Sequence, residues 1–216
     1  NNPTNGQFLQ AQSGEGGGLT WADAGGGVDS DAARNTAAGS NAGNSITGNS
    51  GTDNTSIGYD AGTALEDGLY NTAVGSKALK TGADCTGNTA VGWRSLEDCA
   101  DGGEYNTCVG YFAGGNLTTA DHNVAVGASA LDAVHTGGYN TALGASSLSA
   151  LEGGTRNIAI GASSGTNFLT GDDNIAIGNY SYALANTGNH NVCLGSSAMQ
   201  GAITTQSYNI AIGSRA

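Results

Sequence analysis

The sequence contains a single proline, only six lysines and arginines, and 6% aromatic residues. Against these six cations stand 18 aspartates and glutamates, which give a net charge of −12. Nucleic acids and anionic membranes bind proteins through clustered Lys and Arg, so the charge argues against both as partners. No apolar run approaches the roughly 20 residues of a membrane-spanning helix, and residues 1–30 lack the pattern of a signal peptide. We therefore expect no nucleic-acid partner and no membrane insertion.

Cysteine is also scarce, with Cys85, Cys99, Cys108 and Cys193. None has the CxxC or Cys/His spacing of a zinc site, so no metal is predicted from them. Cys108 and Cys193 lie far apart in the sequence at equivalent places in the repeat described below, and are interpreted as small packing residues. Cys85 and Cys99 fall in neighbouring repeat units, and the spacing leaves open whether they form a disulfide.

Glycine is abundant, with 38 residues, and it recurs in a repeated pentapeptide. Asn-Thr-Ala-Val-Gly occurs at 71–75 and again at 88–92, and close variants follow at intervals of 17 or 18 residues. The units begin at Asn54, Asn71, Asn88, Asn106, Asn123, Asn140, Asn157, Asn174, Asn191 and Asn209, with an irregular forerunner at 35–39. A short fixed period predicts units that stack on their neighbours. Seventeen residues are too few for two packed helices, and Asn, Gly, Thr, Val and Ile favour strands and turns.

Within each unit we count the Asn as position 0. Positions 1 and 3 are mostly Thr, Val, Ile or Leu, and position 2 is small; side chains alternate along a strand, so positions 1 and 3 share one face. We expect the branched residues to fill the inside of a coil and the small residues to face outward against identical chains. Cyclic symmetry then predicts a homotrimer. The residues predicted to pack at its axis are Ala73, Ala90, Cys108, Ala125, Ala142, Ala159, Ala176, Cys193 and Ala211.

The second half of each unit predicts the opposite wall of the coil. The apolar residues there are Leu79, Leu96, Leu131, Leu148 and Met199 at position 8, and Leu65, Leu117, Val134, Leu151 and Phe168 at position 11. Glycine-rich turns close the unit, and the Asn residues are expected to form a ladder of amides. The predicted fold is all-β: a parallel β-roll or β-helix solenoid with 17-residue coils over residues 35–216, clear from residue 54, after a Gly-rich connector at 1–34. At ~4.8 Å per coil, the ten clear units span roughly 50 Å.

The unit N-[TIV]-A-[VIL]-G-x-x-[AS]-L resembles the head repeat of YadA-type trimeric autotransporter adhesins, and similar repeats occur in bacteriophage tail and head fibres. The resemblance covers about residues 35–216 and implies a left-handed parallel β-roll with three chains side by side. The chain departs from the adhesin pattern in its longer period and its coil-closing loops. The preceding segment is similar to those before such repeats in phage fibres, through Gln7, Leu9, Leu19, Thr20 and Trp21.

The sequence offers little catalytic chemistry. A depolymerising tailspike needs paired carboxylates in a groove, whereas the acidic pairs here occur in expected loops. Asp172 and Asp173 could bind calcium weakly, although the nonapeptide typical of calcium β-rolls is missing, which favours a solvated turn. His122 and His190 are four units apart and cannot share a metal within one chain. We therefore predict no catalytic residues, no metal and no cofactor.

Exposed aromatic residues are the candidate ligand contacts. One column directly precedes the motif Asn and contains Tyr70, Tyr105, His122, Tyr139, His190 and Tyr208. A second patch, after the motif Gly, contains Tyr59, Trp93, Tyr111 and Phe112. Such rings suit contacts with sugars because each offers an apolar face and a polar tip. The alternative is that they only cover the edge of the coil.

These observations and the resemblance favour a structural and adhesive protein without enzymatic activity. We expect a phage tail or head fibre rod, located in the virion, with partners that are its own copies, other fibre or baseplate proteins, and host polysaccharide or lipopolysaccharide. One alternative is a trimeric adhesin or filament subunit on a bacterial surface. The other is a polysaccharide-depolymerising tailspike. An ice-binding rod is disfavoured because no Thr-x-Thr array repeats on one face.

Overall fold

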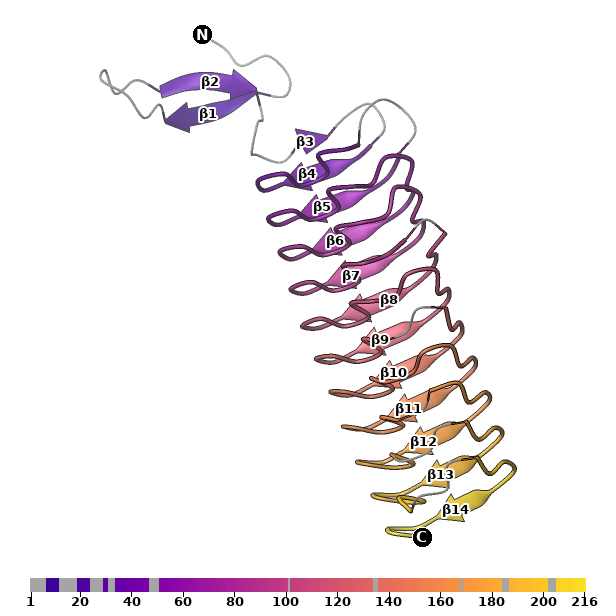
Figure 1. Ribbon diagram of the computed structural model, residues 1–216. Helices are drawn as coiled ribbons and strands as arrows, with labels where there is room; N and C mark the ends of the chain where they lie inside the picture. The colour runs from indigo at the N-terminus through magenta and orange to yellow at the C-terminus, as the bar shows by residue number, and fades with distance from the viewer. Residues whose placement is uncertain are drawn as a thin grey trace.

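The computed structural model describes residues 7–11, 19–23, 29–30, 34–46, 51–100, 102–133, 136–167, 169–183, 187–201 and 205–216, with side chains from residue 34 onward. Its main body is a single stack of coils, each of which contributes one short strand to a continuous sheet (Figure 1). The strands are β3 (Asp29–Ser30), β4 (Thr36–Ala38), β5 (Thr55–Ile57), β6 (Thr72–Val74), β7 (Thr89–Val91), β8 (Thr107–Val109), β9 (Val124–Val126), β10 (Thr141–Leu143), β11 (Ile158–Ile160), β12 (Ile175–Ile177), β13 (Val192–Leu194) and β14 (Ile210–Ile212). The predicted parallel β-solenoid is therefore confirmed.

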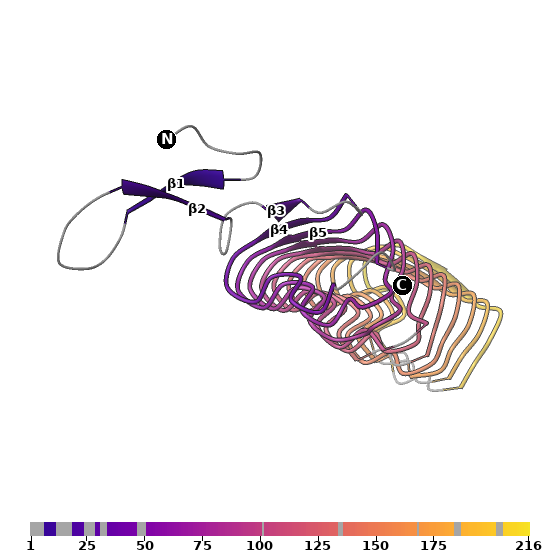
Figure 2. The same ribbon diagram turned by 90° about the horizontal axis from the view of Figure 1, so that it is seen from above.

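Strand register follows the sequence repeat without slippage. Every pair from β4 to β14 is parallel and joins equivalent positions, as in Ala142 with Ala159 and Leu143 with Ile160. In this sheet β3 pairs with β4 in the antiparallel direction, at the first coil. Seen from above, successive coils repeat nearly the same outline (Figure 2). Equivalent residues of all the coils therefore form columns that run along the stack.

The orientation of the strands is opposite to the one expected from the sequence. The small residues at position 2 point into the coil: Ala73, Ala90, Cys108, Ala125, Ala142, Ala159, Ala176 and Cys193 are fully buried within one chain, and Ala211 of the last coil packs against the same core. The branched residues at positions 1 and 3 face outward, and the side chains of Ile160 and Ile177 are 36% and 38% exposed to solvent. The assignment of the Ala column to a trimer axis is therefore wrong.

The narrow interior of the coil explains this orientation. Leu79, Leu96, Leu131 and Leu148, which project from the opposite wall at position 8, are fully buried and fill the space between the walls. In two coils with glycine at position 8, a fully buried leucine at position 11 takes that space: Leu65 follows Gly62 and Leu117 follows Gly114. A Cβ placed on Gly114 would lie 2.4 Å from the Cys108 sulfur, so the two walls leave room for only a small group at position 2. Val134 and Phe168 lie outside the described residues.

The predicted asparagine ladder is present along the whole stack. In each coil the Asn side chain Oδ1 accepts the backbone N–H of the next ladder Asn, as between Asn140 and Asn157 at 2.9 Å. Its Nδ2 donates to a carbonyl near the end of its own coil, as from Asn140 to Gly154 at 2.9 Å. The ladder side chains from Asn35 to Asn191 are buried, so the ladder pairs polar groups that water cannot reach.

The corners of the coils use left-handed backbone at many residues other than glycine. The motif Gly adopts φ near 130° as expected, for example 132° at Gly75. Positions −1, 6 and 8 are also left-handed in every coil described there, with φ of 59° at both Tyr70 and Lys77 and 46° at Leu79. Side chains in this conformation cost roughly 1–2 kcal/mol each, which the repeated packing of the stack must offset.

A hairpin in the connector and a disulfide between two neighbouring coils complete the fold. Strands β1 (Gln7–Ala11) and β2 (Leu19–Asp23) form an antiparallel hairpin of their own within the expected connector. Cys85 and Cys99, left open by the sequence, are joined by a disulfide. Within the described residues we found no helix with the length and apolar character needed to span a membrane.

Candidate functional site

The residues at position −1 form a column that we call the lateral column. It comprises Arg34, Asp53, Tyr70, Gly87, Tyr105, His122, Tyr139, Arg156, Asp173, His190 and Tyr208, all with positive φ. The backbone N–H of each member from Tyr70 onward donates to the preceding coil, as from Tyr139 to the carbonyl of Asp121 at 3.0 Å. These bonds hold the side chains of successive coils one strand spacing apart, about 4.8 Å.

The middle of the lateral column is a stack of three rings. Tyr105 and His122 lie 5.1 Å apart between ring centroids, and His122 and Tyr139 lie 4.8 Å apart with planes 14° from parallel. Gly87 leaves space for this stack, because a Cβ there would lie 2.6 Å from the Tyr105 ring. Tyr105 and Tyr139 remain 52% and 62% exposed. Because ring faces inside the stack cover one another, the exposed surface of Tyr105 and Tyr139 includes the edges of their rings.

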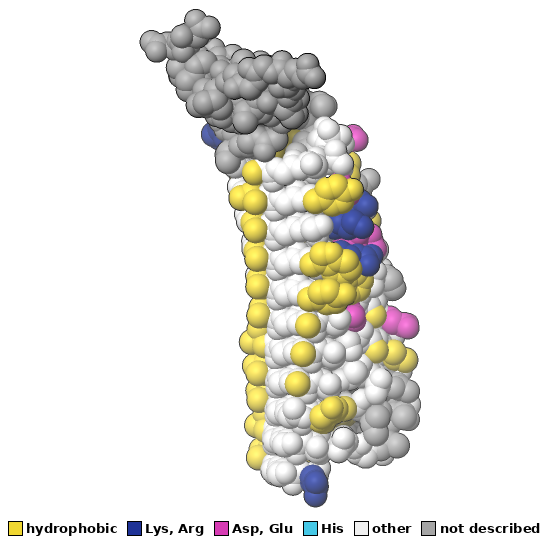
Figure 3. Space-filling model, turned by 90° about the vertical axis from the view of Figure 1, so that its left-hand side faces the viewer, with side chains coloured by type: hydrophobic (Ala, Val, Ile, Leu, Met, Phe, Trp, Pro, Cys, Tyr) yellow, Lys and Arg dark blue, Asp and Glu magenta, His cyan; other side chains and the backbone are white. Residues whose placement is uncertain are grey.

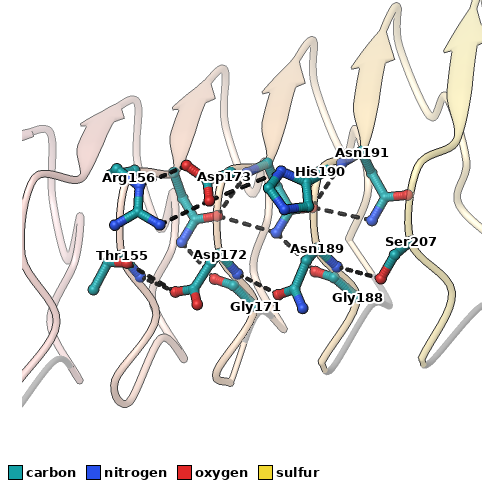
Figure 4. Close-up of polar contacts among 12 residues, drawn as sticks. Thr155, Arg156, Gly171, Asp172, Asp173, Gly188, Asn189, His190, Asn191 and Ser207 are labelled. Atoms are coloured by element: carbon teal, nitrogen blue, oxygen red, sulfur yellow. Dashed lines mark hydrogen bonds and ion pairs between the residues drawn. The ribbon is translucent and has the colours of Figure 1, made fainter.

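Nearer the C-terminus, the lateral column contains an ion pair. Arg156 forms an ion pair with Asp173 at 2.6 Å, and the His190 Nδ1 lies 3.8 Å from the same carboxylate (Figure 4). The Arg156 guanidinium holds the pKa of Asp173 below its ordinary value. The ring of His190 also stacks on Tyr208 at 4.9 Å. The same pairing occurs between Arg34 and Asp53, where the pKa of Asp53 is likewise lowered.

Position −2 carries a second hydrogen-bonded ladder, which the sequence pattern did not predict. Asp172 accepts from the backbone N–H and hydroxyl of Thr155, at 2.7 and 2.9 Å (Figure 4). Asn189 accepts from the Asp172 N–H, and the Ser207 hydroxyl accepts from the Asn189 N–H. The two acids considered for calcium thus each bind a neighbouring coil. No cluster of three or more His, Cys, Asp or Glu suited to a metal occurs among the described residues.

Positions 5 and 6 carry the second group of aromatic side chains together with their polar and basic neighbours. We call this surface the corner patch, and it comprises Tyr59, Ser76, Lys77, Trp93, Arg94, Tyr111 and Phe112. Trp93 stacks on Tyr111 with ring centroids 4.7 Å apart and planes 13° from parallel. The Arg94 guanidinium lies 5.0 Å from the ring centroids of both Trp93 and Phe112. Large hydrophobic side chains and basic side chains lie next to each other on this face (Figure 3). Further along the stack, position 5 is reduced to Ala128, Ala145 and Ala162.

Two cysteines and one tyrosine are buried in the interior and stay protonated at neutral pH. Burial raises the pKa of both Cys108 and Cys193 to about 12, so their thiols stay protonated at neutral pH. Burial also raises the pKa of Tyr182 to about 12, and its hydroxyl oxygen accepts a hydrogen bond from Asn191 Nδ2 at 2.6 Å. These groups pack the core and offer no nucleophile to a ligand outside.

All the ligand contacts predicted from the sequence lie on the surface of the coil stack, in two separate columns rather than one site. The period of the repeat was sufficient to predict each column. It did not reveal which rings stack, nor that Lys77 and Arg94 lie beside the aromatic side chains of the corner patch. Comparison of the chain with protein-family models, with curated proteins and with solved structures found no significant match.

Proposed function

We propose that this chain is a rod segment of an extracellular fibre, as in a bacteriophage tail or head fibre, and that it binds polysaccharide or lipopolysaccharide on a host cell. The observation that carries the proposal is the pair of exposed aromatic columns on a regular stack of coils. Tyrosine, tryptophan and histidine combine an apolar ring with a polar tip, which suits the alternating CH and OH groups of a sugar. The disulfide between Cys85 and Cys99 is also typical of proteins that act outside the cytosol.

The regular spacing of the columns suits a long polymeric ligand. Equivalent residues recur at about 4.8 Å along the rod, so one polysaccharide chain can meet several rings at once. Each contact is weak by itself, and several linked contacts raise the overall affinity. The lateral column and the corner patch both run along the stack, which favours an extended glycan over a compact ligand.

We further propose that the rod assembles as a homotrimer through the outward face of the sheet. Positions 1 and 3 carry only uncharged side chains from β4 to β14, and Ile57, Val126, Ile160 and Ile177 are 36–42% exposed on this face. A line of hydrophobic side chains runs along the rod beside the corner patch (Figure 3). Because every coil presents the same pattern at the same spacing, copies of the chain can pack against one another in register around a common axis.

The same arguments apply to a trimeric adhesin or filament subunit on a bacterial surface, which would use the rod in the same way. We do not propose a depolymerase. Asp172 and Asp173, the paired carboxylates nearest to such a role, are held by Thr155 and Arg156 of the preceding coil.

The proposal is tested by binding of the full chain to immobilised capsular polysaccharide and lipopolysaccharide from candidate host bacteria. Binding should be retained in the exposed-site control Gln200→Ala and weakened at least fivefold in Tyr139→Ala, because Tyr139 ends the central ring stack. Soluble sugar released during incubation would point to the depolymerase instead. Absence of binding to every surface polysaccharide tested would contradict the proposal.

A further inference from the structure

The corner patch contains a gap in its stack of rings. Position 5 is occupied in successive coils by Tyr59, Ser76, Trp93 and Tyr111. Backbone bonds keep these coils adjacent, since Lys77 N–H donates to the Tyr59 carbonyl at 2.8 Å and Arg94 N–H to the Ser76 carbonyl at 3.0 Å. The small side chain of Ser76 therefore stands where its neighbours on both sides have rings.

The gap has the dimensions of one more ring. Trp93 and Tyr111, one coil apart, stack at 4.7 Å. Tyr59 and Trp93 are two coils apart, which is about 9.6 Å at strand spacing. A six-membered ring over Ser76 would lie about 4.8 Å from each neighbour, the ordinary distance of a stacked pair. Tyr59 and Trp93 are 53% and 40% exposed, so the gap opens to solvent (Figure 3).

Positive charge borders the gap on one side. Lys77 follows Ser76 directly, and no ion pair of Lys77 occurs among the described residues. Arg94, at the equivalent position of the next coil, uses its Nε for Glu97 and keeps its terminal nitrogens for other acceptors. Three of the six basic residues of the chain, Lys77, Lys80 and Arg94, fall between residues 77 and 94. On the opposite side, Asp60 occupies the same position in the Tyr59 coil, and its carboxylate accepts a hydrogen bond from Asn41 Nδ2 at 2.9 Å. The positive charge at the gap therefore lies on the side of the Ser76 and Trp93 coils.

We propose that the gap over Ser76 binds an acidic saccharide. Its pyranose ring stacks between Tyr59 and Trp93, and its anionic group contacts Lys77. This inference rests on the proposed carbohydrate recognition and names the sugar class for one of its two surfaces. Carboxylate and phosphate groups share the required charge, and the experiment below separates them. A neutral sugar would gain the stacking contacts alone.

The test uses the full chain and three monosaccharides: methyl glucuronide, glucose 6-phosphate and methyl glucoside. Affinities are measured by NMR titration. At least one acidic sugar should bind about tenfold more tightly than the neutral glucoside, since a charge-assisted hydrogen bond is roughly twice as strong as a neutral one. The tighter of the two acids identifies the anionic group. Equal affinity for all three, or binding of none, would overturn the proposal.

Two variants locate the site. Ser76→Tyr supplies the missing ring and should abolish binding of all three sugars, and the fold accepts Tyr there because Tyr59 and Tyr111 occupy the same position. In Lys77→Gln, the acidic and neutral sugars should bind with about the same affinity. The weak binding of the neutral sugar should be unchanged. Arg94 is left intact because its loss would strand the buried Glu97 carboxylate.

The matched control is Ala145→Tyr, which places a ring at position 5 in a coil outside the corner patch and should leave all three affinities unchanged. If Ser76→Tyr binds like the parent protein, the inference fails. Polysaccharide binding that persists in Ser76→Tyr but falls in Tyr139→Ala would still support the proposed function. The two proposals can therefore fail separately.

Discussion

The side-chain oxygen of Asn123 accepts the backbone N–H of Asn140 at 2.9 Å, and Asn140 offers its own oxygen to Asn157 in the same way. The amide of Asn140 also donates to the Gly154 carbonyl and so closes its coil. One side chain thus links its coil to the next coil and also joins the beginning of its own coil to the end. No other polar residue of this size carries both a donor and an acceptor in this arrangement, which explains why position 0 is Asn in every coil.

We predict that Asn140→Ala lowers the free energy of unfolding by about 2–4 kcal/mol, because it leaves the Asn157 N–H and the Gly154 carbonyl buried without their partners. Urea unfolding followed by circular dichroism measures the change. The exposed Asn179→Ala serves as a control and should alter stability by less than about 0.5 kcal/mol. An Asn140→Ala protein as stable as the parent would show that the ladder contributes nothing.

Substitutions on the two faces of the sheet should have different consequences. Ala125→Leu overfills the space beside Leu131 and should destabilise each chain by about 1–3 kcal/mol or more. Unfolding by urea of the dissociated chain checks this expectation. If Ala125→Leu instead leaves stability unchanged and only prevents assembly, the interior assigned to position 2 is incorrect.

Ile160→Lys combined with Ile177→Lys should act on assembly alone. Both side chains face outward, so lysine there remains solvated in a single chain, whereas in a packed trimer it would bury charge. Light scattering should give the mass of a trimer for the parent protein and of a monomer for the variant, with unchanged circular dichroism. A parent protein that is monomeric at all concentrations would refute the proposed assembly.

Ser56→Ala should stabilise the protein. Ser56 is fully buried at position 2, and its hydroxyl has no hydrogen-bond partner, whereas most other coils have Ala there. Removing the unpaired hydroxyl should raise the free energy of unfolding by about 1 kcal/mol. The reciprocal change Ala73→Ser should lower it by a similar amount in the same urea experiment. Destabilisation by Ser56→Ala would mean that the hydroxyl has a partner.

Alkaline pH should destabilise the chain through its buried thiols. The pKa of Cys108 is about 12 in the folded protein against an ordinary 9.0, so the thiol is neutral in both states well below pH 9. Between pH 9 and 12 only the unfolded thiol ionises, and stability falls by about 1.4 kcal/mol per pH unit for such a group. Unfolding curves at pH 8, 9, 10 and 11 should show a smaller loss in Cys108→Ala. Identical slopes for both proteins would contradict the assignment.

The disulfide should stabilise the coils that it joins. Cys85 and Cys99 are separated by 14 residues, and a loop of this size is expected to contribute about 3 kcal/mol. Dithiothreitol should therefore lower the unfolding midpoint of the parent protein but leave that of the Cys85→Ala, Cys99→Ala double variant unchanged. Equal sensitivity of both proteins to the reductant would show that the two cysteines are not paired.

Much of the fold follows from the repeat. The recurrence of Asn at 17 or 18 residues predicted the coils, the strands directly after each Asn, the amide ladder and the glycine corners. The same period placed Tyr105, His122 and Tyr139 in one column. These features depend on equivalent residues occupying equivalent positions in successive coils. A regular repeat in the sequence is sufficient to predict such positions.

The orientation of the strands did not follow in the same way. Alternation separates Ala159 from Ile158 and Ile160 but does not say which face lies inside. That choice depends on the opposite wall, where Leu148 and its equivalents fill the interior and leave space only for a small side chain such as Ala, Ser or Cys. The left-handed backbone at residues such as Leu79 was not predicted either, because an isolated chain has no reason to prefer it.

The sequence by itself therefore determined the architecture: one coil per repeat unit, parallel and in register, with Asn stacked on Asn. The tertiary structure decided which side chains are inside, which cysteines pair, and where the surface places rings beside charges. The physical reason is that hydrogen-bond register depends on the local repeat. Burial depends instead on the distance between the two walls of a coil, and surface chemistry depends on which residues the stacking of coils brings together.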